Sequence, residues 1–522
     1  MSERLRRLAA IVKADLLIRF RRPSTIVVFL LLSAFAYLWI PDPATGRALI
    51  VIDDKRALYN SAAIGMATAS LGTIFIGLAG FYVISSAIRR DVQSRCGYVI
   101  ASTTMRAPEY LLGKVFGNIV FLSTFMTGFM VSSMAMLLVR GEAPLEPLVF
   151  ARQYLLLVPP AIVFVSVVAI VFESIPFLSG KFGDVAYFFL WMGSLGVVAT
   201  NIGKGGDPGW AGYFDTSGFG FLQASLKTDR LSIGATSFDP SHGVYVFGGM
   251  TVSPEWILPR LVATFSPLAL MAMALLFFHR FDPARLRKAG QKASRGWMAR
   301  IGALAKPMAR RVYGLGVRGA GGSLLGTARA DAMMSLSAFP LSIVLVAGFS
   351  VAAMATPLPQ LARVVLPIAF AAAAVLIADA PAREHRSGTV GLVYASPRLK
   401  SLFVWWKFAV TLLMSAIILI GPLLKIALAR PAALPALLVG VIFISAFATA
   451  LGVISSNPKT FIVVFLTFWY LVVSDHGGSP GLDFAGFYGV VTPAILAAYA
   501  ACAVGALVVA QIFHSARLRR AW

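Results

Sequence analysis

Charged residues are scarce in this sequence of 522 residues. Asp, Glu, Lys and Arg make up 13% of it, against roughly 25% in soluble globular domains. Apolar residues make up 58%, and the mean hydropathy is +0.81. This shortage of charge excludes a soluble enzyme, a disordered tail and a nucleic-acid-binding domain as starting classes. The composition predicts an all-α polytopic membrane protein.

Motifs for catalysis, metal binding and nucleotide binding are also missing. The two cysteines, Cys96 and Cys502, stand in unrelated contexts and give no disulfide framework, and five scattered histidines give no metal-binding tract. HExxH and CxxC do not occur. The Gly-Lys pairs at 113–114 and 180–181 lack the glycine spacing and the following Ser or Thr of a Walker A loop. We expect no catalytic residues, metal or cofactor in this chain, and no ATP hydrolysis by it.

Long apolar runs, in contrast, are abundant. A helix that crosses a bilayer needs about 20 mostly apolar residues. The first run, after a basic N-terminus, resembles a signal peptide, but its length and the lack of a small-residue cleavage site favour an uncleaved first span. Twelve runs qualify, in two sets of six: 24–40, 62–88, 111–139, 153–172, 185–202 and 256–279, then 339–356, 360–380, 402–428, 432–455, 460–474 and 492–513.

The net charge of +24 suggests a polyanionic partner until the basic residues are placed on this topology. With twelve spans, 32 Lys and Arg residues fall on the side of the N-terminus and 10 on the other side. The positive-inside rule then predicts that both termini are cytoplasmic. Most of the basic excess is explained by topology and by contact with anionic lipid headgroups, so we expect no nucleic-acid partner.

The two sets of spans share short motifs in the same order, which predicts an internal duplication. "KADLLIRFRRP" precedes the first span and "RADAMMSLSAFP" the seventh. The domains would be an N-terminal helix (1–22), a first six-span unit (23–280), a basic linker with a second such helix (281–338) and a second six-span unit (339–522). Because six is even, the two units would be parallel repeats, with the functional interface between them.

The segment before the last span of each unit carries the best match. In the first unit it belongs to a large outer loop (203–255) with extra residues near 216–250. The matching residues are Gly205, Gly206, Pro208 and Gly209 in the first unit, and Gly477, Gly478, Pro480 and Gly481 in the second.

Residues 3–20 and two loops carry the other local features. Apolar residues at helical spacing among arginines predict an amphipathic helix at the membrane surface, with a plain basic anchor as the alternative. Loop 1 (89–114) and loop 2 (383–407) each join charges, a glycine, an Ala-Ser pair and a closing lysine. These residues are Arg89, Arg90, Asp91, Gly97, Ser102 and Lys114 in loop 1, and Arg383, Glu384, Gly391, Ser396, Pro397 and Lys407 in loop 2.

We expect Gly97 and Gly391 to break the helix, and Ser102 and Ser396 to cap the next short one, with Pro397 at its first position. Each loop would then present a short helix with charges at its rim, suited to docking on a partner. A solvated basic loop is the alternative. Two further charges, Arg260 and Lys425, lie inside apolar runs, and we expect both to snorkel to the membrane boundary.

These loops resemble the loop after the second helix in ABC-2 type permeases, the membrane subunits of ATP-binding-cassette exporters. The resemblance covers nearly the whole chain, twice. It implies elbow helices before each six-span unit, coupling helices in loops 1 and 2, and a second ATPase contact near Lys181 and Lys459. It also implies short re-entrant segments at 205–214 and 477–488.

By the same resemblance, the chain would form the translocation pathway of an exporter in a bacterial inner membrane. Two separate nucleotide-binding ATPase subunits would carry ATP and Mg. Two departures concern the loops: Thr103 stands where loop 2 has Pro397, and Asp91 is one residue out of register with Glu384 when both are counted from the loop glycine. The docking contacts of the two loops would therefore be unequal.

Two other classes of protein remain open. A secondary transporter of the major facilitator type also has two parallel six-span halves, but it should carry membrane-embedded acids. The predicted spans contain no chain of acids, since Asp379 lies at the edge of the run 360–380. A scaffold or membrane-embedded enzyme is the other alternative. A scaffold needs no duplicated loops, and an enzyme should show catalytic groups.

Overall fold

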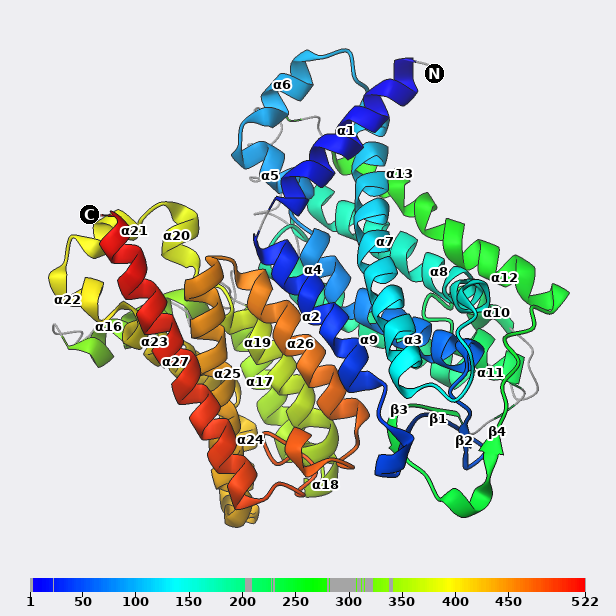
Figure 1. Ribbon diagram of the computed structural model, residues 1–522. Coiled ribbons are helices and arrows are strands. Elements are labelled where there is room, and N and C mark those ends of the chain that lie inside the picture. Colours follow the sequence, from blue (N-terminus) through cyan, green and yellow to red (C-terminus); the bar gives the residue numbers. More distant parts are fainter. Residues whose placement is uncertain are drawn as a thin grey trace. The chain divides into compact units, whose positions relative to one another are not determined.

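The computed structural model describes residues 3–21, 23–201, 209–226, 228, 231–278, 281, 323–337 and 341–521, with isolated positions at 307, 311 and 314. The chain divides into two units, Met1–Gly290 and Gln291–Trp522. The division falls inside the predicted linker. Most of the described residues are helical (Figure 1).

Unit 1 begins with the predicted N-terminal helix and continues with long apolar helices. Helix α3 forms its centre: all fifteen of its residues are buried, and it packs on α7 and α8. Small residues allow this approach, since a Cβ on Gly72 would lie 2.7 Å from Met126 Cε. The helices are α1 (Glu3–Phe20), α2 (Pro23–Trp39), α3 (Ser61–Phe75), α4 (Phe81–Ile84), α5 (Ala87–Gln93), α6 (Cys96–Ser102), α7 (Ala107–Arg140), α8 (Pro147–Ser174), α9 (Lys181–Asn201), α10 (Gly209–Gly212), α11 (Phe219–Leu226), α12 (Pro254–Phe265) and α13 (Met271–Phe277).

A small β-sheet in unit 1 departs from the all-α prediction. Its four strands are β1 (Arg47–Ile52), β2 (Lys55–Ala57), β3 (Leu231–Ser237) and β4 (Val244–Tyr245). Their order is β3-β1-β2-β4, so the predicted insertion at 216–250 supplies both outer strands to a hairpin made by residues 47–57. The sheet lies at the opposite end of unit 1 from α5 and α6 (Figure 1).

Unit 2 contains helices and no strand among its described residues. Helix α25 is central and packs on α23, α26 and α27. Asn457 caps α26 by accepting a hydrogen bond from the Lys459 backbone N–H (3.1 Å), and Pro458 takes the first helical position. The helices are α16 (Leu324–Ser337), α17 (Leu341–Ala355), α18 (Leu358–Gln360), α19 (Leu366–Ile377), α20 (Arg383–Ser387), α21 (Val390–Tyr394), α22 (Pro397–Ser401), α23 (Phe403–Ile418), α24 (Ile420–Ala429), α25 (Leu434–Ser455), α26 (Pro458–Ser474) and α27 (Pro493–Ala521).

Each of the twelve predicted apolar runs coincides with helix, but not all of these helices are long enough to span a bilayer. Seven pass by length and composition, and the number rises to nine if two bent helix pairs count as one span each. One such pair is α23 and α24, which meet at 68°. Two shorter apolar helices, over 182–198 and 458–474, account for two further predicted runs. The chain is therefore a multi-pass helical membrane protein.

Candidate functional site

A buried cluster of charged side chains joins three helices of unit 1: α1, α5 and α7. We call it cluster 1. Asp15 of α1 pairs with Arg19 (2.6 Å) on the same helix and with Arg90 on α5. Lys114 of α7 bridges the two acids, since its Nζ lies 3.2 Å from Asp15 Oδ1 and 2.8 Å from Asp91 Oδ2. These ion pairs therefore connect the amphipathic N-terminal helix α1 to loop 1 and to α7, the long helix after loop 1.

Uncharged groups and close packing complete cluster 1. Tyr110 donates a hydrogen bond to Asp91 Oδ2 (2.7 Å), and Arg19 donates one to Asn118 Oδ1 (2.6 Å). A Cβ on Gly117 would lie 3.3 Å from Asp15 Oδ2, so this glycine leaves room for the carboxylate. Burial alone would raise the pKa of Asp15, but Arg19, Lys114 and Arg90 outweigh it and lower the pKa. The carboxylate therefore stabilises the fold at neutral pH, and that contribution is lost only in acid, as pH falls through the lowered pKa.

Unit 2 contains a second cluster of the same kind, cluster 2, which joins α16, α20 and α23. Lys407 Nζ lies 3.0 Å from Asp331 Oδ2 and 2.6 Å from Glu384 Oε1, and none of the lysine side chain is exposed. Arg383 pairs with both acids and also donates to Ser335 Oγ (2.8 Å). Burial would lower the pKa of Arg383, but Asp331 and Glu384 raise it, so its guanidinium stays charged.

The two clusters correspond position by position. In each cluster, an aspartate on the helix before the first long span pairs with an arginine from the loop. A lysine on the next long helix bonds both this aspartate and the loop acid that follows the arginine, and the lysine comes 23 residues after that loop acid. The one-residue difference in register counted from the loop glycines therefore leaves the ion pairs equivalent. The corresponding pairs are Asp15 and Asp331, Arg19 and Ser335, Arg90 and Arg383, Asp91 and Glu384, Tyr110 and Phe403, Lys114 and Lys407, and Asn118 and Thr411.

These contacts change the interpretation of the loop charges. We expected charges at the rim of a docking helix, but Asp91, Lys114, Glu384 and Lys407 are all buried. They hold the loop in place and do not face a partner. Arg89, in contrast, is exposed. Sequence reasoning marked Asp15 and Asp331 only as repeat positions. The equal acid-to-lysine spacing in both loops was the available signal.

The tips of the two loops expose apolar side chains. In α6, Tyr98 is 50% exposed and Val99 68%, and in α21 Leu392 is 79% exposed. Tyr98 and Leu392 directly follow the loop glycines Gly97 and Gly391, so they occupy matching places in loops 1 and 2, and Val99 is the next residue of loop 1. The rest of each loop is tied to its unit by the buried charges, and these short helices are what it presents outward.

The predicted roles of the loop glycines and serines are partly wrong. Gly97 and Gly391 lie inside α6 and α21, and the helix breaks fall instead at Arg95 (φ 61°) and Gly388 (φ 71°). Ser102 is the last residue of α6 and bonds back to the Val99 carbonyl, so it caps no following helix. Ser396 occupies the N-cap position of α22, but its side chain makes no capping hydrogen bond. Pro397 is the first residue of α22, as predicted.

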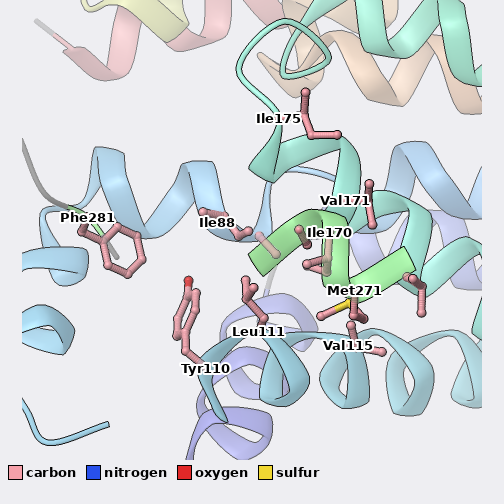
Figure 2. Close-up of a cluster of buried hydrophobic side chains, with 12 residues drawn as sticks. Ile88, Tyr110, Leu111, Val115, Ile170, Val171, Ile175, Met271 and Phe281 are labelled. Atoms are coloured by element: carbon pink, nitrogen blue, oxygen red, sulfur yellow. The ribbon is translucent and has the colours of Figure 1, made fainter. Parts of the chain in front are cut away.

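Loop 1 also rests on an apolar cluster. Figure 2 shows Ile88 of α5, Tyr110 and Leu111 of α7, Ile170 of α8 and Met271 of α13 gathered around one buried region. Phe281 lies at one end of this cluster, and its ring makes an edge-to-face contact with the ring of Tyr110. A Cβ on Gly97 would lie 2.6 Å from Phe281, so this glycine is needed for close packing and not for a helix break.

A carboxylate fixes the start of loop 1. Glu173, at the end of α8, accepts hydrogen bonds from the backbone N–H groups of Ser86, Ala87 (2.9 Å), Ile88 (2.6 Å) and Arg89 (3.3 Å). Ser86 has a left-handed backbone (φ 92°), which turns the chain sharply into α5. Glu173 therefore caps the loop helix from a neighbouring long helix.

The remaining predicted site residues lie apart from the clusters. Lys181 is the first residue of α9, and Lys459, in the first turn of α26, is partly buried. Gly205, Gly206 and Pro208 lie outside the described residues, and Gly209 begins α10.

The segment 477–488 is described. Gly477 has a positive φ (84°) and packs on Tyr488, Gly478 closes a turn onto Asp475, and Pro480 and Gly481 form a 3-10 turn. The segment then buries Phe484 and Phe487 against Phe370. Its re-entrant character stays a prediction.

The expectation that Arg260 snorkels is wrong. Its side chain is buried and donates to the carbonyls of Leu156 (2.9 Å), Leu157 (3.1 Å) and Asp215 (2.8 Å). Pro160 has no N–H and so frees the Leu156 carbonyl in α8, which the guanidinium then satisfies. Lys425 plays a related part in unit 2, where it donates to the Ala353 carbonyl (2.6 Å) at the end of α17.

No family model, no curated protein and no solved structure matches this chain.

Proposed function

We propose that this chain is the transmembrane permease subunit of an ATP-driven exporter of the ABC-2 type. Loops 1 and 2 would dock on two separate ATPase subunits, which bind the ATP and Mg that this chain has no motif to hold. The two units would be repeats of one six-span element, with the translocation pathway between them. The complex would work in a bacterial inner membrane, with both termini and both loops in the cytoplasm.

One observation carries this proposal. In each unit, a buried charge cluster ties a surface helix, a loop and the following long helix into one block, and the loop exposes an apolar side chain at its tip. A docked partner that pushed on Val99 or Leu392 would move that block as a whole, because its buried ion pairs are costly to break. Such a block can pass the force of ATP binding into the membrane helices.

The repetition of the block supports the two-unit arrangement. Seven positions correspond between cluster 1 and cluster 2, and in both the lysine follows the loop acid by the same number of residues. A chain with two equivalent docking loops suits two ATPase subunits. A secondary transporter has no need for such a pair.

Site-specific cross-linking tests the proposal. In a Cys96→Ser, Cys502→Ser background, we would place single cysteines by Val99→Cys and Leu392→Cys, and cross-link in native membranes. We expect adducts with an ATPase that contains a Walker A motif, identified by mass spectrometry, at both positions. Native mass measurement of the gently solubilised complex should give two ATPase copies for each chain.

The matched control is Val246→Cys, because Val246 is 67% exposed, as Val99 is, and lies beside the sheet of unit 1. It should give no ATPase adduct. A chain that runs alone by native mass and gives no ATPase adduct from either loop would contradict the proposal and favour the secondary-transporter alternative.

A further inference from the structure

Loop 2 is held to the last helix of unit 2 by a small cluster of histidine, tyrosine and arginine side chains. Tyr394 of α21 places its hydroxyl 3.4 Å from His514 Nδ1 and 3.5 Å from His385 Nε2. Arg517 of α27 lies 3.2 Å from the same His385 nitrogen, and His514 Nε2 lies 2.8 Å from the Lys400 carbonyl. The end of α27 lies beside α20 and α21 (Figure 1).

The partners fix the protonation of both rings. An arginine can only donate, so His385 Nε2 must present its lone pair and the ring must be neutral. A carbonyl can only accept, so His514 Nε2 carries hydrogen, which leaves Nδ1 to accept from Tyr394. The cluster thus holds together with two neutral imidazoles around one fixed positive charge.

Arg517 extends this anchor to a third helix. Its guanidinium also donates to the carbonyls of Val453 (3.3 Å) and Ile454 (3.2 Å) and to Ser456 Oγ (3.2 Å), at the end of α25. The side chain of His385 therefore connects loop 2 to the ends of both α25 and α27.

The charges around His385 oppose its protonation overall. Arg517 and His514 face it from α27, Tyr394 from α21 and the ring of Phe403 from α23, whereas Glu384 is its neighbour on α20. Burial lowers the pKa of His385 below its usual 6.5, Arg517 and His514 lower it further, and Glu384 acts in the other direction. Because the neutral form is favoured by the fold, the anchor is present above pH 6.5 and is lost as pH falls through the lowered pKa.

Loop 1 has no counterpart to this device. It contains no histidine, and its start is fixed by the Glu173 carboxylate on four backbone N–H groups.

We propose that loop 2 is a pH-sensitive docking loop, released from α27 when His385 is protonated, and that loop 1 is not. The release of loop 2 needs only this chain and no partner. Its consequence, weaker docking of one ATPase, rests on the proposed function. Acidification would then loosen one of the two docking sites and leave the other.

Hydrogen exchange of the full chain in nanodiscs tests the release. Exchange of the 390–402 amides would be compared at pH 7.5 and pH 5.5, after correction for intrinsic rates, with the 96–106 amides of loop 1 as the internal reference. We expect protection of loop 2 to fall by up to about tenfold at pH 5.5, because this pH lies one unit below the ordinary histidine pKa of 6.5. Loop 1 should change less than twofold, as a rough limit, because it contains no histidine.

Two variants make the result specific. His385→Gln has an amide oxygen that can accept from Arg517 and cannot take a proton, so the pH dependence of loop 2 should fall to the part that His514 contributes. His242→Gln removes an exposed histidine of unit 1 and should leave the pH dependence unchanged. Equal protection of wild-type loop 2 at both pH values, or an unchanged pH dependence in His385→Gln, would overturn the proposal. Neither measurement needs an ATPase, so this result stands apart from the cross-linking result.

Discussion

Cluster 1 and cluster 2 build the same arrangement from different residues. Cluster 1 joins two acids to three cations, and cluster 2 joins two acids to two cations. The additional cation is Arg19, whose place in unit 2 is taken by Ser335. Both clusters still connect a surface helix, a loop and a long helix.

The difference concerns how much each cluster depends on its lysine. In cluster 1, Asp15 keeps Arg19 and Arg90 if Lys114 is removed, and Asp91 keeps Tyr110. In cluster 2, Arg383 alone would have to serve both acids, and Phe403 has no hydroxyl to replace Tyr110. The acids of cluster 2 therefore have fewer alternative donors than those of cluster 1. Loss of the lysine should destabilise unit 2 more than unit 1.

The largest expected effect is the loss of Lys407. Lys407→Met leaves two buried acids with one cation, and breaking such a pair costs about 3–5 kcal/mol. Lys114→Met should cost about 1–3 kcal/mol, because both acids keep donors. The local free energy of opening, measured by hydrogen exchange of the α23 and α7 amides, checks the order.

Lys55→Met is the control for the lysine variants, because Lys55 is exposed on β2 and should change neither helix. An equal cost for the two cluster lysines, or a larger one for Lys114, would contradict the difference in redundancy.

The second effect compares the isolated cations. Arg260→Met leaves the carbonyls of Leu156, Leu157 and Asp215 without this donor inside unit 1, and we expect a cost of about 1–3 kcal/mol. Lys425→Met should cost less, because Lys425 is only partly buried at a helix end. Thermal unfolding in one detergent compares the two variants. If Arg260→Lys is as destabilising as Arg260→Met, the planar guanidinium that reaches all three carbonyls is essential. A cost of Arg260→Met below that of Lys425→Met would sink the assignment.

The long apolar helices could be predicted from the sequence because hydropathy determines them. Every predicted run coincides with helix, from 24–40 to 492–513, and residues 3–20 form the predicted first helix almost to the residue. The sheet could not be predicted, since β1 and β3 are short and separated in sequence by residues 53–230. Strand pairing over such a distance leaves no local pattern.

The candidate site was predicted in its residues but not in its arrangement. Arg90, Asp91 and Lys114 were singled out together with their counterparts in loop 2, yet their burial was not expected. A sequence that places opposite charges in a loop predicts that they face solvent. Only the fold shows that a surface helix covers them. The Arg260 prediction failed for a similar reason: its partners are distant backbone carbonyls, and one of them, that of Leu156, is freed by Pro160.

The third prediction gives cluster 1 the residue types that unit 2 has at two matching positions. Arg19→Ser removes the additional cation and leaves Asn118 Oδ1 without this donor, which should cost about 1–2 kcal/mol. Adding Asn118→Thr, the residue type at the matching place in unit 2, should recover part of that cost, because a threonine hydroxyl can bond a helix carbonyl as Thr411 does. A double-mutant cycle on α1 and α7 exchange measures the coupling. Strict additivity would show that the two positions do not act as one unit.

The smallest effect concerns the cap that only loop 1 has. Glu173→Gln keeps an oxygen that can accept hydrogen bonds but removes the negative charge at the start of α5, a change worth about 0.3–1 kcal/mol at a helix N-terminus. Helix α20 of loop 2 begins at Arg383 without a side-chain cap, so its exchange should not change. Faster exchange of the 87–93 amides in the variant, with unchanged 383–387 amides, is the expected result. Glu146→Gln is the matched control, because Glu146 precedes α8 without capping it. Unchanged exchange of α5 would mean that loop 1 is held by cluster 1 and its apolar contacts alone.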